Sequence, residues 1–474
     1  MDILLINPDY MLYANPPLGL AYLGAYIRKK GFKVDILDQL NEEEILKNIK
    51  ETRPKIIGIT AVSENYYRVK NLGEKIKKIS DSLLIIGGVH ITTSPDSFEN
   101  SPFDLAIKGE GEITFSKIAD LVKKNKLDKK NLKKIKGIIF RDKEKIVDTG
   151  FGEQIENLDS LPMPARDLMD MEYYNLPTIL SGDDFDTIGS IITSRGCPYN
   201  CKFCSSSCFW GRRIRFFSAK RVVEEIKELY FKYKYKKIFI YDDLFTINKK
   251  RLKEIVNLLE KERLLGKIKF YVYGRADVFD EEIAKMLKKM NVITIDFGLE
   301  SGSDKTLHYL KGGIISVKDN ENAVRLAKKY DFIVGGFFMI GSPYETIDDM
   351  DKTYEFIKKN CKENFIIYQT IPFPGTAIWD YALKEKIIEK DYYDKKRKEF
   401  IDIDKSILLT KEVSKKEFEE MYNKIKELYT NTNKNLLLKK IFKLRPKHII
   451  SFLSPKFRKK ALILRKQFIK RVFS

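Results

Sequence analysis

The sequence predicts an α/β protein with two successive α/β domains followed by a helical, basic C-terminal region. Two observations support this fold class. Short apolar segments alternate with helical segments over the first 148 residues and again between residues 186 and 385, and such alternation is typical of parallel sheets. After residue 385 the alternation stops. We therefore expect domains at 1–148 and 186–385, a linker at 149–185 and a helical region at 386–474.

The first domain is predicted to be a doubly wound parallel sheet, closed by a hairpin over residues 137–147. Ligands of such sheets bind beyond the carboxyl ends of the strands. Glycine is common in turns of this kind, so glycine-rich loops at these ends do not identify a ligand by themselves. Strands are expected at 3–7, 34–38, 56–60, 83–88 and 105–108, and helices at 19–30, 42–51, 65–79 and 111–124.

The second domain has six predicted strands, and polar residues follow most of them. Functional residues of βα barrels lie at the carboxyl ends of strands. Asp242, Asp243, Arg275, Glu300 and Ser301 occupy such positions. Each carboxylate can equally cap a helix at a βα turn. The strands are expected at 188–193, 237–241, 270–273, 293–298, 333–340 and 365–369, with helices at 219–234, 281–289 and 320–329 between them.

Three of the five cysteines lie within eight residues, in the segment Cys197-Pro198-Tyr199-Asn200-Cys201-Lys202-Phe203-Cys204. Thiolates hold iron–sulfur clusters, and closely spaced cysteines on one loop can reach one cluster. A structural zinc site normally needs a second, separated pair of ligands, which the sequence lacks. A disulfide framework is not expected in a long chain with so few cysteines. Cys208 remains an alternative fourth ligand.

This C-x3-C-x-(aromatic)-C spacing resembles the signature of the radical S-adenosylmethionine (SAM) enzymes. The resemblance implies that Cys197, Cys201 and Cys204 bind a [4Fe-4S] cluster whose open iron takes the amino and carboxylate groups of SAM. It also implies that Phe203 lies against the adenine. In this family an electron from the cluster splits SAM into methionine and a 5′-deoxyadenosyl radical. The protein is therefore expected to be an enzyme with an electron donor of the ferredoxin or flavodoxin type.

The motifs after the predicted strands also match this family in order, which implies an open, partial (β/α)6 barrel. Glu300 can accept hydrogen bonds from the amino group or ribose of SAM, and Arg275 can pair with a carboxylate. Asp242 or Asp243 is expected near the methionine part or as a partner of Arg275, and Ser301 is included among the residues that contact SAM. No catalytic residue is assigned. Candidate substrate-facing aromatic residues are Tyr309, Tyr344 and Tyr368.

As an ordered set, the loops of the first domain resemble the cobalamin-binding domain that precedes many radical SAM domains. The D-x-H-x-x-G motif, whose histidine binds cobalt in other cobalamin proteins, is absent, and the chain has only His90, His308 and His448. Cobalamin is thus expected to bind without a histidine on cobalt, with His90 as a hydrogen-bonding loop residue. The implied cobalamin-binding residues are Pro17, Gly19, Ser63, Gly87, Gly88, His90, Gly109, Glu110 and Gly111.

Basic residues exceed acidic ones by 88 − 67 = 21, and residues 431–474 hold fourteen basic residues and no acidic one. Because Leu, Ile and Phe alternate with these charges, the segment is predicted to contact a membrane surface. Packing on the protein or binding of nucleic acid are the alternatives. A helix over residues 414–429, with Ser414 and Glu417 as a capping box, is expected to close the open side of the barrel.

The leading hypothesis is a cobalamin-dependent radical SAM enzyme that methylates an unactivated carbon of a lipid, lipid-linked or other hydrophobic substrate. A radical SAM cyclase, oxidase or rearrangement enzyme without methyl transfer is the alternative, and a nucleic-acid-binding iron–sulfur protein ranks lower. No apolar run reaches the roughly 18 residues that span a bilayer, and the N-terminus lacks a basic leader. We expect a cytoplasmic protein with peripheral contact at the inner membrane face.

Overall fold

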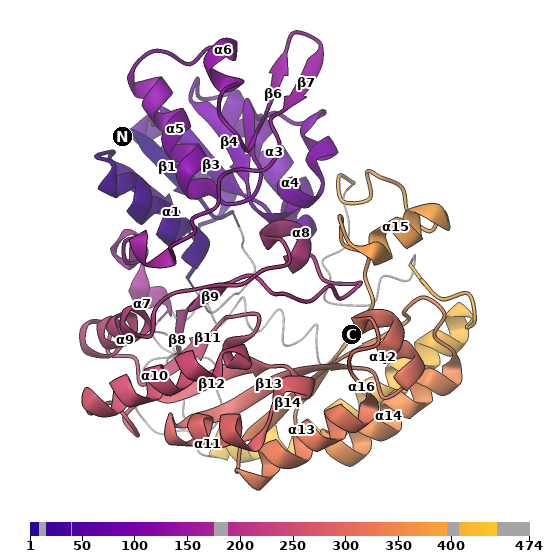
Figure 1. Cartoon of the computed structure of the whole chain (residues 1–474). Helices are drawn as coiled ribbons and strands as arrows, with labels where there is room; N and C mark the ends of the chain where they lie inside the picture. Colours follow the sequence, from indigo (N-terminus) through magenta and orange to yellow (C-terminus); the bar gives the residue numbers. More distant parts are fainter. Residues whose placement is uncertain (9–15, 39, 175–187, 396–406, 443–474) are drawn as a thin grey trace. The chain divides into compact units, whose positions relative to one another are not determined.

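The computed structural model describes residues 1–8, 16–38, 40–174, 188–395 and 407–442 (Figure 1). The chain divides into two compact units. The N-terminal unit contains Met1–Met171, Cys208–Gly211 and the described part of Glu389–Glu399, and the barrel unit contains the rest. Residues 149–171 of the predicted linker thus group with the N-terminal unit, whereas residues 175–187 lie outside the described ranges.

The N-terminal unit is built on one seven-stranded sheet with the order β2-β1-β3-β4-β5-β6-β7. The first five strands are parallel, and the last two form the expected hairpin, which extends the sheet in antiparallel pairing. Because β1 pairs with both β2 and β3, the strand order reverses there, which confirms a doubly wound sheet. The strands are β1 (Ile3–Ile6), β2 (Val34–Leu37), β3 (Ile56–Thr60), β4 (Leu83–Gly87), β5 (Leu105–Ile107), β6 (Ile138–Asp142) and β7 (Lys145–Asp148).

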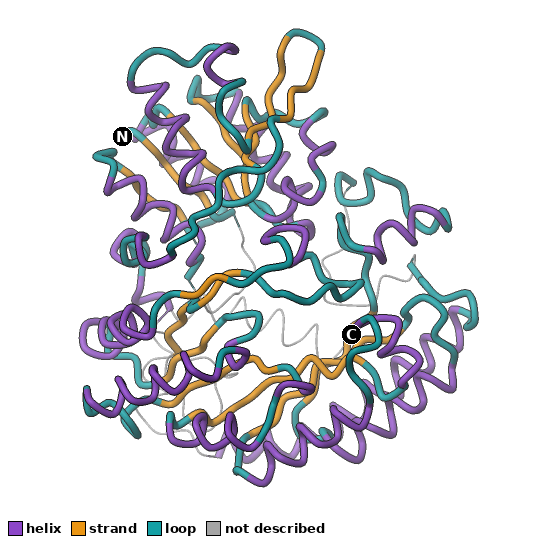
Figure 2. Tube along the Cα trace, viewed as in Figure 1, coloured by secondary structure: helices purple, strands orange, loops and turns teal. Residues whose placement is uncertain are grey.

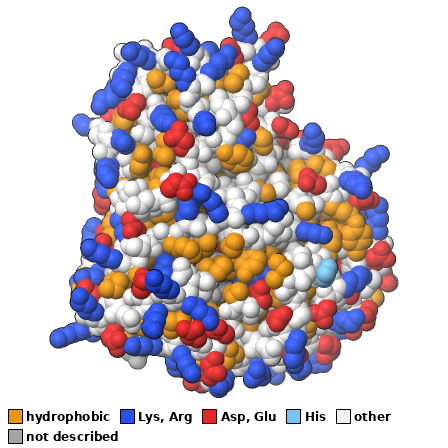
Figure 3. All heavy atoms as spheres, in the orientation of Figure 1, with side chains coloured by type: hydrophobic (Ala, Val, Ile, Leu, Met, Phe, Trp, Pro, Cys, Tyr) orange, Lys and Arg blue, Asp and Glu red, His pale blue; other side chains and the backbone are white. Residues whose placement is uncertain are grey.

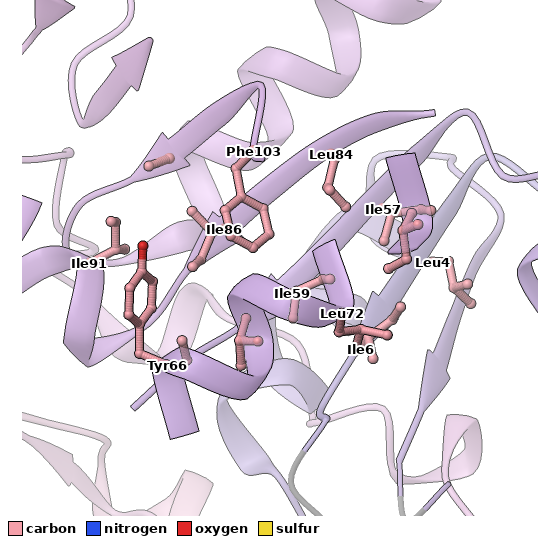
Figure 4. Close-up of a cluster of buried hydrophobic side chains, with 14 of the residues drawn as sticks. Leu4, Ile6, Ile57, Ile59, Tyr66, Leu72, Leu84, Ile86, Ile91 and Phe103 are labelled. Carbon is pink, nitrogen blue, oxygen red and sulfur yellow. The ribbon is translucent and has the colours of Figure 1, made fainter. Parts of the chain in front are cut away.

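Helices cover this sheet and bury its branched side chains. Figure 4 shows Leu4, Ile57 and Leu84 from neighbouring strands in one buried cluster with Tyr66 and Leu72 of α3. β-branched and aliphatic residues fit such strands because both faces of a parallel sheet are covered. The helices are α1 (Leu18–Lys29), α2 (Glu42–Thr52), α3 (Tyr66–Lys77), α4 (Val89–Thr93), α5 (Gly111–Lys123) and α6 (Lys129–Leu132). The short helix α7 (Met171–Tyr174) begins at the last residue of this stretch of the N-terminal unit.

The barrel unit contains a six-stranded sheet in which the order β15-β14-β13-β12-β11-β8 follows the chain. All five pairings are parallel, which confirms the six predicted βα units and an open rather than closed barrel. A short antiparallel ribbon, β9 (Ser194–Arg195) with β10 (Arg215–Phe216), was not predicted. The main strands are β8 (Ile188–Ile191), β11 (Lys237–Ile240), β12 (Lys269–Gly274), β13 (Val292–Glu300), β14 (Ile333–Ile340) and β15 (Phe365–Gln369).

Amphipathic helices pack on one face of this sheet, as Figures 1 and 2 show. Side chains of alternate strand positions, such as Ile238, Val272 and Phe338, are fully buried beneath them. The helices in this part of the chain, of which α8 and α15 do not belong to that layer, are α8 (Ser206–Trp210), α9 (Ala219–Lys227, continued by a π-helical turn to Lys232), α10 (Lys249–Lys261), α11 (Glu281–Lys289), α12 (Asp304–Lys311), α13 (Val317–Lys329), α14 (Ile347–Asn360), α15 (Ala377–Lys384) and α16 (Lys415–Phe442).

The last described helix is longer than predicted. α16 begins with the expected capping box, since the amide of Ser414 donates to Glu417 and the amide of Glu417 donates to the Ser414 hydroxyl. It continues to Phe442 because neither glycine nor proline interrupts residues 430–442. The helix packs beside α14 and the edge strand β15. The predicted membrane-contacting segment lies mostly beyond it, at residues outside the described ranges.

The surface carries many charges of both signs. On the face shown in Figure 3, Lys and Arg side chains are interspersed with Asp and Glu, and no large area of one sign is visible. Within the described ranges, no helix is both long enough and apolar enough to cross a membrane.

Candidate active site

The cysteine loop follows β8 and β9 at the carboxyl end of the barrel sheet. Its central residue is held through the backbone: the amide of Lys202 donates to the carbonyl of Leu310 at 2.9 Å, and its carbonyl accepts from the amide of Ile378 at 3.1 Å. These partners belong to α12 and α15, so elements far along the chain fix the loop. Cys197, Cys201 and Cys204 are free, half-buried thiols on it.

The surroundings of the thiols are partly apolar and partly cationic. Burial is the main cause that raises the pKa of Cys197 to about 11 and that of Cys204 to about 12. Two groups oppose this effect: the amide of Ser206, 3.5 Å from the Cys204 sulfur, lowers the pKa of Cys204, and the charge of Arg275 lowers that of Cys197. Nη1 of Arg275 also lies 3.8 Å from the Cys201 sulfur. Metal ligation requires thiolates, and such donors stabilise their negative charge.

The donor set fits an iron–sulfur cluster in type and number. Three soft sulfur ligands stand on one loop, and cluster-binding proteins use such thiolates. In the described chain, no three His, Cys, Asp or Glu side chains are already arranged around one metal position. Cys208 lies in α8 and groups with the N-terminal unit.

Arg275 follows β12 and is fixed from three sides. Its Nε donates to Asp277 at 2.6 Å, its guanidinium lies 3.6 Å from the centre of the Tyr199 ring, and Nη1 approaches Cys201. Its Nη2 is buried without a hydrogen-bond partner among the described residues. A buried guanidinium with an open N–H group is suited to bind a carboxylate.

The two aspartates after β11 hold the cysteine loop in place. Asp242 is fully buried and accepts four hydrogen bonds, from the amides and hydroxyls of Thr193 and Ser194. Asp243 accepts a 2.6 Å hydrogen bond from the Ser206 hydroxyl. Burial raises the pKa of both aspartates. Direct contact of Asp242 with SAM would require one of its four hydrogen bonds to break, so its geometry favours a positioning role.

Glu300 ends β13 in a strained backbone conformation. Its φ of +61° and the hydrogen bond from the Ser301 amide to the Leu299 carbonyl, 2.8 Å, form a tight γ-turn. Non-glycine residues adopt this conformation rarely, and it is concentrated at functional sites. The Oε1 atom of Glu300 lies 3.2 Å from Nζ of Lys311, and both side chains are buried. Lys311 also donates to the carbonyl of Gly298 at 2.6 Å.

The remaining predicted residues of the barrel unit fall into different surroundings. Ser301 is fully buried and exchanges a 3.0 Å hydrogen bond with Thr353, so it is part of the wall behind Glu300. Phe203 is half-buried on the cysteine loop. Tyr309 lies 5.4 Å from Tyr344, ring centre to ring centre, and Lys202 lies over Tyr309. The rings of these two tyrosines are therefore in contact, and one of them packs on the cysteine loop.

Sequence reasoning missed three features of this unit. Lys311 was not singled out, the β9–β10 ribbon was not predicted, and Asp296 was passed over as part of an apolar strand. Asp296 had a signal: it is an acidic residue in the middle of a mostly apolar strand, Val292–Glu300. The contacts of Lys311 depend on the tight turn at Glu300, and no residue pattern in the sequence predicts that turn.

In the N-terminal unit, the predicted cobalamin loops all lie at the carboxyl ends of β1, β3, β4 and β5. Backbone at Gly19 and Gly87 is open, since a Cβ atom there would meet no protein atom within 4 Å. Gly88 adopts a φ of +101°, and a Cβ there would lie 2.6 Å from the carbonyl oxygen of Ala61. These open glycines at the ligand-binding end of the sheet fit the close approach of a large cofactor.

The other predicted residues of these loops shape the same end of the sheet. Pro17 precedes α1, and α5 begins at Gly111 after the positive φ of Gly109. Glu110 is buried and accepts from the amide of Ile155 at 3.3 Å. The Glu110 carboxylate therefore ties the loop after β5 to the segment that follows the hairpin.

His90 is fully buried and engaged on both sides. Its Nδ1 lies 3.1 Å from the hydroxyl of Ser63, and its Nε2 lies 3.1 Å from the hydroxyl of Ser97. The ring also packs on Tyr66 at 4.0 Å between centres, and burial lowers the pKa of His90 to about 3. Both ring nitrogens of His90 therefore have hydrogen-bond partners within this unit. Ser63 is likewise buried as a partner of His90.

Known proteins share both units. The profile of the Radical SAM superfamily matches residues 191–357, and the profile of the B12 binding domain matches residues 11–119. An uncharacterized methyltransferase of Pyrococcus horikoshii is 35% identical over 380 residues, covering 79% of this chain and 80% of the relative. The hopanoid C-3 methylase of Methylococcus capsulatus is 25% identical over 417 residues, which cover 83% of this chain and 74% of the relative.

A solved structure has the same fold. The radical S-adenosylmethionine methyltransferase TsrM from Kitasatospora setae, with cobalamin and a [4Fe-4S] cluster bound, superposes with a TM-score of 0.65 at 20% identity, covering 81% of this chain and 76% of that chain. An open six-stranded barrel with a three-cysteine loop, joined to a doubly wound B12 domain, defines a class of radical SAM enzymes.

The chain belongs to the radical SAM enzymes that carry an N-terminal B12-binding domain. It is a cobalamin-dependent enzyme whose cofactors are a [4Fe-4S] cluster, SAM and cobalamin. Enzymes of this class require an electron donor besides their substrate.

Proposed function

We propose that the protein transfers a methyl group to an unactivated carbon of a hydrophobic substrate. The observation that carries the proposal is the length of the match to the Pyrococcus methyltransferase, 380 residues, which is longer than either domain alone. The match covers 79% of this chain and therefore extends into both predicted domains. When bound, the cluster and SAM supply a 5′-deoxyadenosyl radical and cobalamin supplies a methyl group.

The residues of this chain would hold and orient these groups. Cys197, Cys201 and Cys204 provide sulfur ligands, and Asp242 and Asp243 hold the loop that carries them. Arg275 offers an open guanidinium N–H to the SAM carboxylate, and Glu300 faces the amino group or ribose. Phe203 and Ser301 complete the proposed SAM site, and the proposed cobalamin loops contain Pro17, Gly19, Ser63, Gly87, Gly88, His90, Gly109, Glu110 and Gly111.

The predicted domain division is part of this proposal: 1–148 binds cobalamin, 149–185 connects, 186–385 binds the cluster and SAM, and 386–474 is accessory. The substrate is proposed to be a lipid or a lipid-linked precursor. The hopanoid methylase resembles 83% of this chain, and residues 431–474 combine basic and aliphatic residues as a membrane-contacting segment does. The enzyme would then work in the cytoplasm at the inner membrane face.

Methyl transfer can be tested without the substrate. We would reconstitute the full chain anaerobically with iron, sulfide and reduced cobalamin, and add SAM with a trideuterated methyl group. Mass spectrometry should detect trideuteromethyl-cobalamin and S-adenosylhomocysteine in amounts that grow with time. Cleavage of SAM to 5′-deoxyadenosine without any labelled cobalamin would refute methyl transfer and favour ring formation or rearrangement.

The binding mode of cobalamin can be tested on the same preparation. Electron paramagnetic resonance of the protein loaded with cob(II)alamin should show no coupling of cobalt to a protein nitrogen, because both ring nitrogens of His90 are occupied. A cobalt–nitrogen coupling that disappears in His90→Ala would contradict the proposal. Failure of the chain to retain any cobalamin would contradict it too.

A further inference from the structure

The barrel sheet has a second face, opposite its helices, that is lined by aromatic side chains. In a parallel sheet, the side chains of residues paired across neighbouring strands point to the same face, and successive residues of one strand point to opposite faces. The helix-covered side chains, such as Ile238, Val272 and Phe338, are buried, whereas the aromatic side chains on the opposite side are partly exposed. We call this second side the aromatic face, and its members are Phe239, Tyr241, Tyr271, Tyr273, Phe337 and Tyr368.

The rings of the aromatic face form a continuous chain from β11 to β15. Phe239 stacks on Tyr241 at 4.4 Å between ring centres, and Tyr273 lies 6.0 Å from Phe337. Phe337 in turn stacks on Tyr368 at 6.5 Å. Tyr368 is 52% exposed, so ring surface at the edge strand is accessible. In Figure 3 hydrophobic side chains also gather in a band across the lower half of the visible face.

One carboxylate lies within this face. Asp296 of β13 is the register partner of Tyr273 on β12 and of Gly335 on β14. It forms no hydrogen bond or ion pair with another described residue, and burial alone raises its pKa to about 6. The titratable group that faces it is Tyr273, whose own pKa is raised partly by Asp296. At neutral pH the carboxylate is therefore largely ionised and has no countercharge in the described structure.

The neighbouring strand makes room for this side chain. A Cβ atom on Gly335 would lie 2.0 Å from Oδ1 of Asp296 and 2.9 Å from its Cγ. The carboxylate thus lies directly over the Gly335 backbone. Gly335 has no positive φ, so its backbone conformation does not require glycine. Glycine is needed at this position because a side chain would collide with the Asp296 carboxylate. In the part of the chain that the structure describes, no metal-binding cluster includes Asp296.

We propose that Asp296 selects the substrate by accepting a hydrogen bond from a protonated amine, while the apolar body of the substrate lies on the aromatic face. This inference deepens the proposed function and depends on it for the reaction, although not for the binding. A buried carboxylate without a partner is unfavourable, and an ammonium offers both opposite charge and N–H donors. Aromatic ring faces attract the same cation. A neutral hydroxyl would leave the charge uncompensated.

The test uses three probes with one apolar body: 2-naphthylmethylamine, 2-naphthylmethanol and 2-methylnaphthalene. Their binding to the anaerobic holoenzyme would be measured by calorimetry at pH 7.5. The wild-type chain should bind the amine at least roughly tenfold more tightly than the alcohol, as charge-assisted hydrogen bonds do. Equal affinities for amine and alcohol, or no binding of any probe, would overturn the proposal.

Two variants change the carboxylate in different ways. Asp296→Asn removes its charge at constant shape, and Gly335→Ala keeps the charge but puts a methyl group where the carboxylate lies. Both should reduce the preference for the amine to less than about threefold, with normal iron content and unchanged affinity for methylnaphthalene. Asp331→Asn is the matched control, because Asp331 is exposed beside Lys288, before the amino end of β14. A preference that survives in Asp296→Asn would refute the inference.

These outcomes are separable from methyl transfer itself. Formation of trideuteromethyl-cobalamin needs no substrate, so it is measured on the wild-type chain and on the Asp331→Asn control, independently of amine binding. If the wild-type chain formed none but still preferred the amine, the proposed reaction would fail and the selection by Asp296 would stand.

Discussion

The Nη1 atom of Arg275 lies 3.8 Å from the sulfur of Cys201, which brings a buried guanidinium to the cysteine loop. Asp277 holds the other side of that guanidinium at 2.6 Å, and the two side chains are 5% and 12% exposed. A fixed cation at this distance lowers the energy of a thiolate and of any anionic group that binds beside it. The geometry therefore links the loop that carries the cluster ligands to the proposed site of the SAM carboxylate.

Arg275→Lys should weaken SAM binding more than it affects the cluster. Lysine keeps the charge but cannot hold Asp277 and still present a planar N–H fork to a carboxylate. Loss of one charge-assisted hydrogen bond corresponds to a decrease in affinity of roughly 10- to 100-fold. Anaerobic equilibrium dialysis with SAM measures this, and iron content should stay near the wild-type value. Arg325→Lys, an exposed change on α13, serves as the control. Unchanged affinity in Arg275→Lys would rule out the carboxylate contact.

Removal of any one loop cysteine should abolish cluster assembly. Cys197→Ala, Cys201→Ala and Cys204→Ala each leave two ligands for a four-iron cluster, which normally uses all of its cysteine ligands. Anaerobic iron analysis and visible absorption after reconstitution should show little bound iron in each variant. Cys361→Ala is the matched control, because that thiol is 2% exposed at the end of α14, away from the loop.

Cys208→Ala should behave like the control and retain its iron. Cys208 lies four residues beyond the last loop cysteine, in α8. Iron loss in Cys208→Ala as complete as in Cys201→Ala would mean that the cluster has four protein ligands and no iron left open for SAM.

Lys311→Met should destabilise the barrel unit strongly. The Lys311 ammonium and the Glu300 carboxylate are 5% and 9% exposed, so the variant leaves a buried charge without its partner. Breaking such a pair typically costs about 3–5 kcal/mol. Urea unfolding should show a large decrease in midpoint, and adding Glu300→Gln to Lys311→Met should recover part of it. If the loss of unfolding free energy in the double variant equalled the sum of the losses in the two single variants, the two side chains would not interact.

The sequence predicted the strands of both sheets to within one or two residues at most ends, because β-rich apolar runs alternate with long helical segments. β13 extends to Glu300, two residues beyond the expected Gly298, because the strand continues into the tight turn. The order of the barrel strands follows directly from six successive βα units. The short ribbon of β9 and β10 escaped prediction because two residues per strand carry no pattern.

Motifs predicted the candidate site residues, but they could not predict the contacts that these residues make. Asp242 stands beside Asp243 in the sequence, yet only the fold shows that Asp242 is saturated by Thr193 and Ser194. The role of Asp296 depends on Gly335, which is 39 residues away in sequence and adjacent in the sheet. Such relationships arise from register between strands, which a single sequence does not specify residue by residue.

Acid should destabilise the N-terminal unit through His90. Its pKa falls from an ordinary value of 6.5 to about 3 because the ring is buried. Between these two values the unfolded chain takes up a proton that the folded unit does not, so stability decreases as pH falls from 6.5 toward 3, by up to about 1.4 kcal/mol per pH unit. His90→Gln should lose stability at pH 7 but show a smaller decrease over this window. Urea unfolding at several pH values measures the difference, and identical slopes for both chains would contradict it.

Residues 443–474 should bring the enzyme to an anionic membrane. This segment contains eleven basic and no acidic residues, interleaved with Leu, Ile and Phe. Each basic residue near an anionic surface contributes roughly 1 kcal/mol before screening, while the aliphatic groups enter the headgroup region. Nucleic-acid binding would use the charges but not so many large aliphatic side chains, which reduce solubility when exposed.

The matched shortened chain ends at Phe442, so that α16 is kept. The full chain should sediment with phosphatidylglycerol vesicles, less with phosphatidylcholine vesicles, and less as salt increases, whereas the shortened chain should bind at least roughly tenfold more weakly. Equal binding by both chains, or none by either, would exclude membrane attachment through this segment. A segment that packs on the protein would instead lower the melting temperature on removal without changing vesicle binding. Stronger, salt-sensitive binding to RNA than to the vesicles would assign the charges to nucleic acid, because counterion release makes that interaction steeply salt-dependent as well.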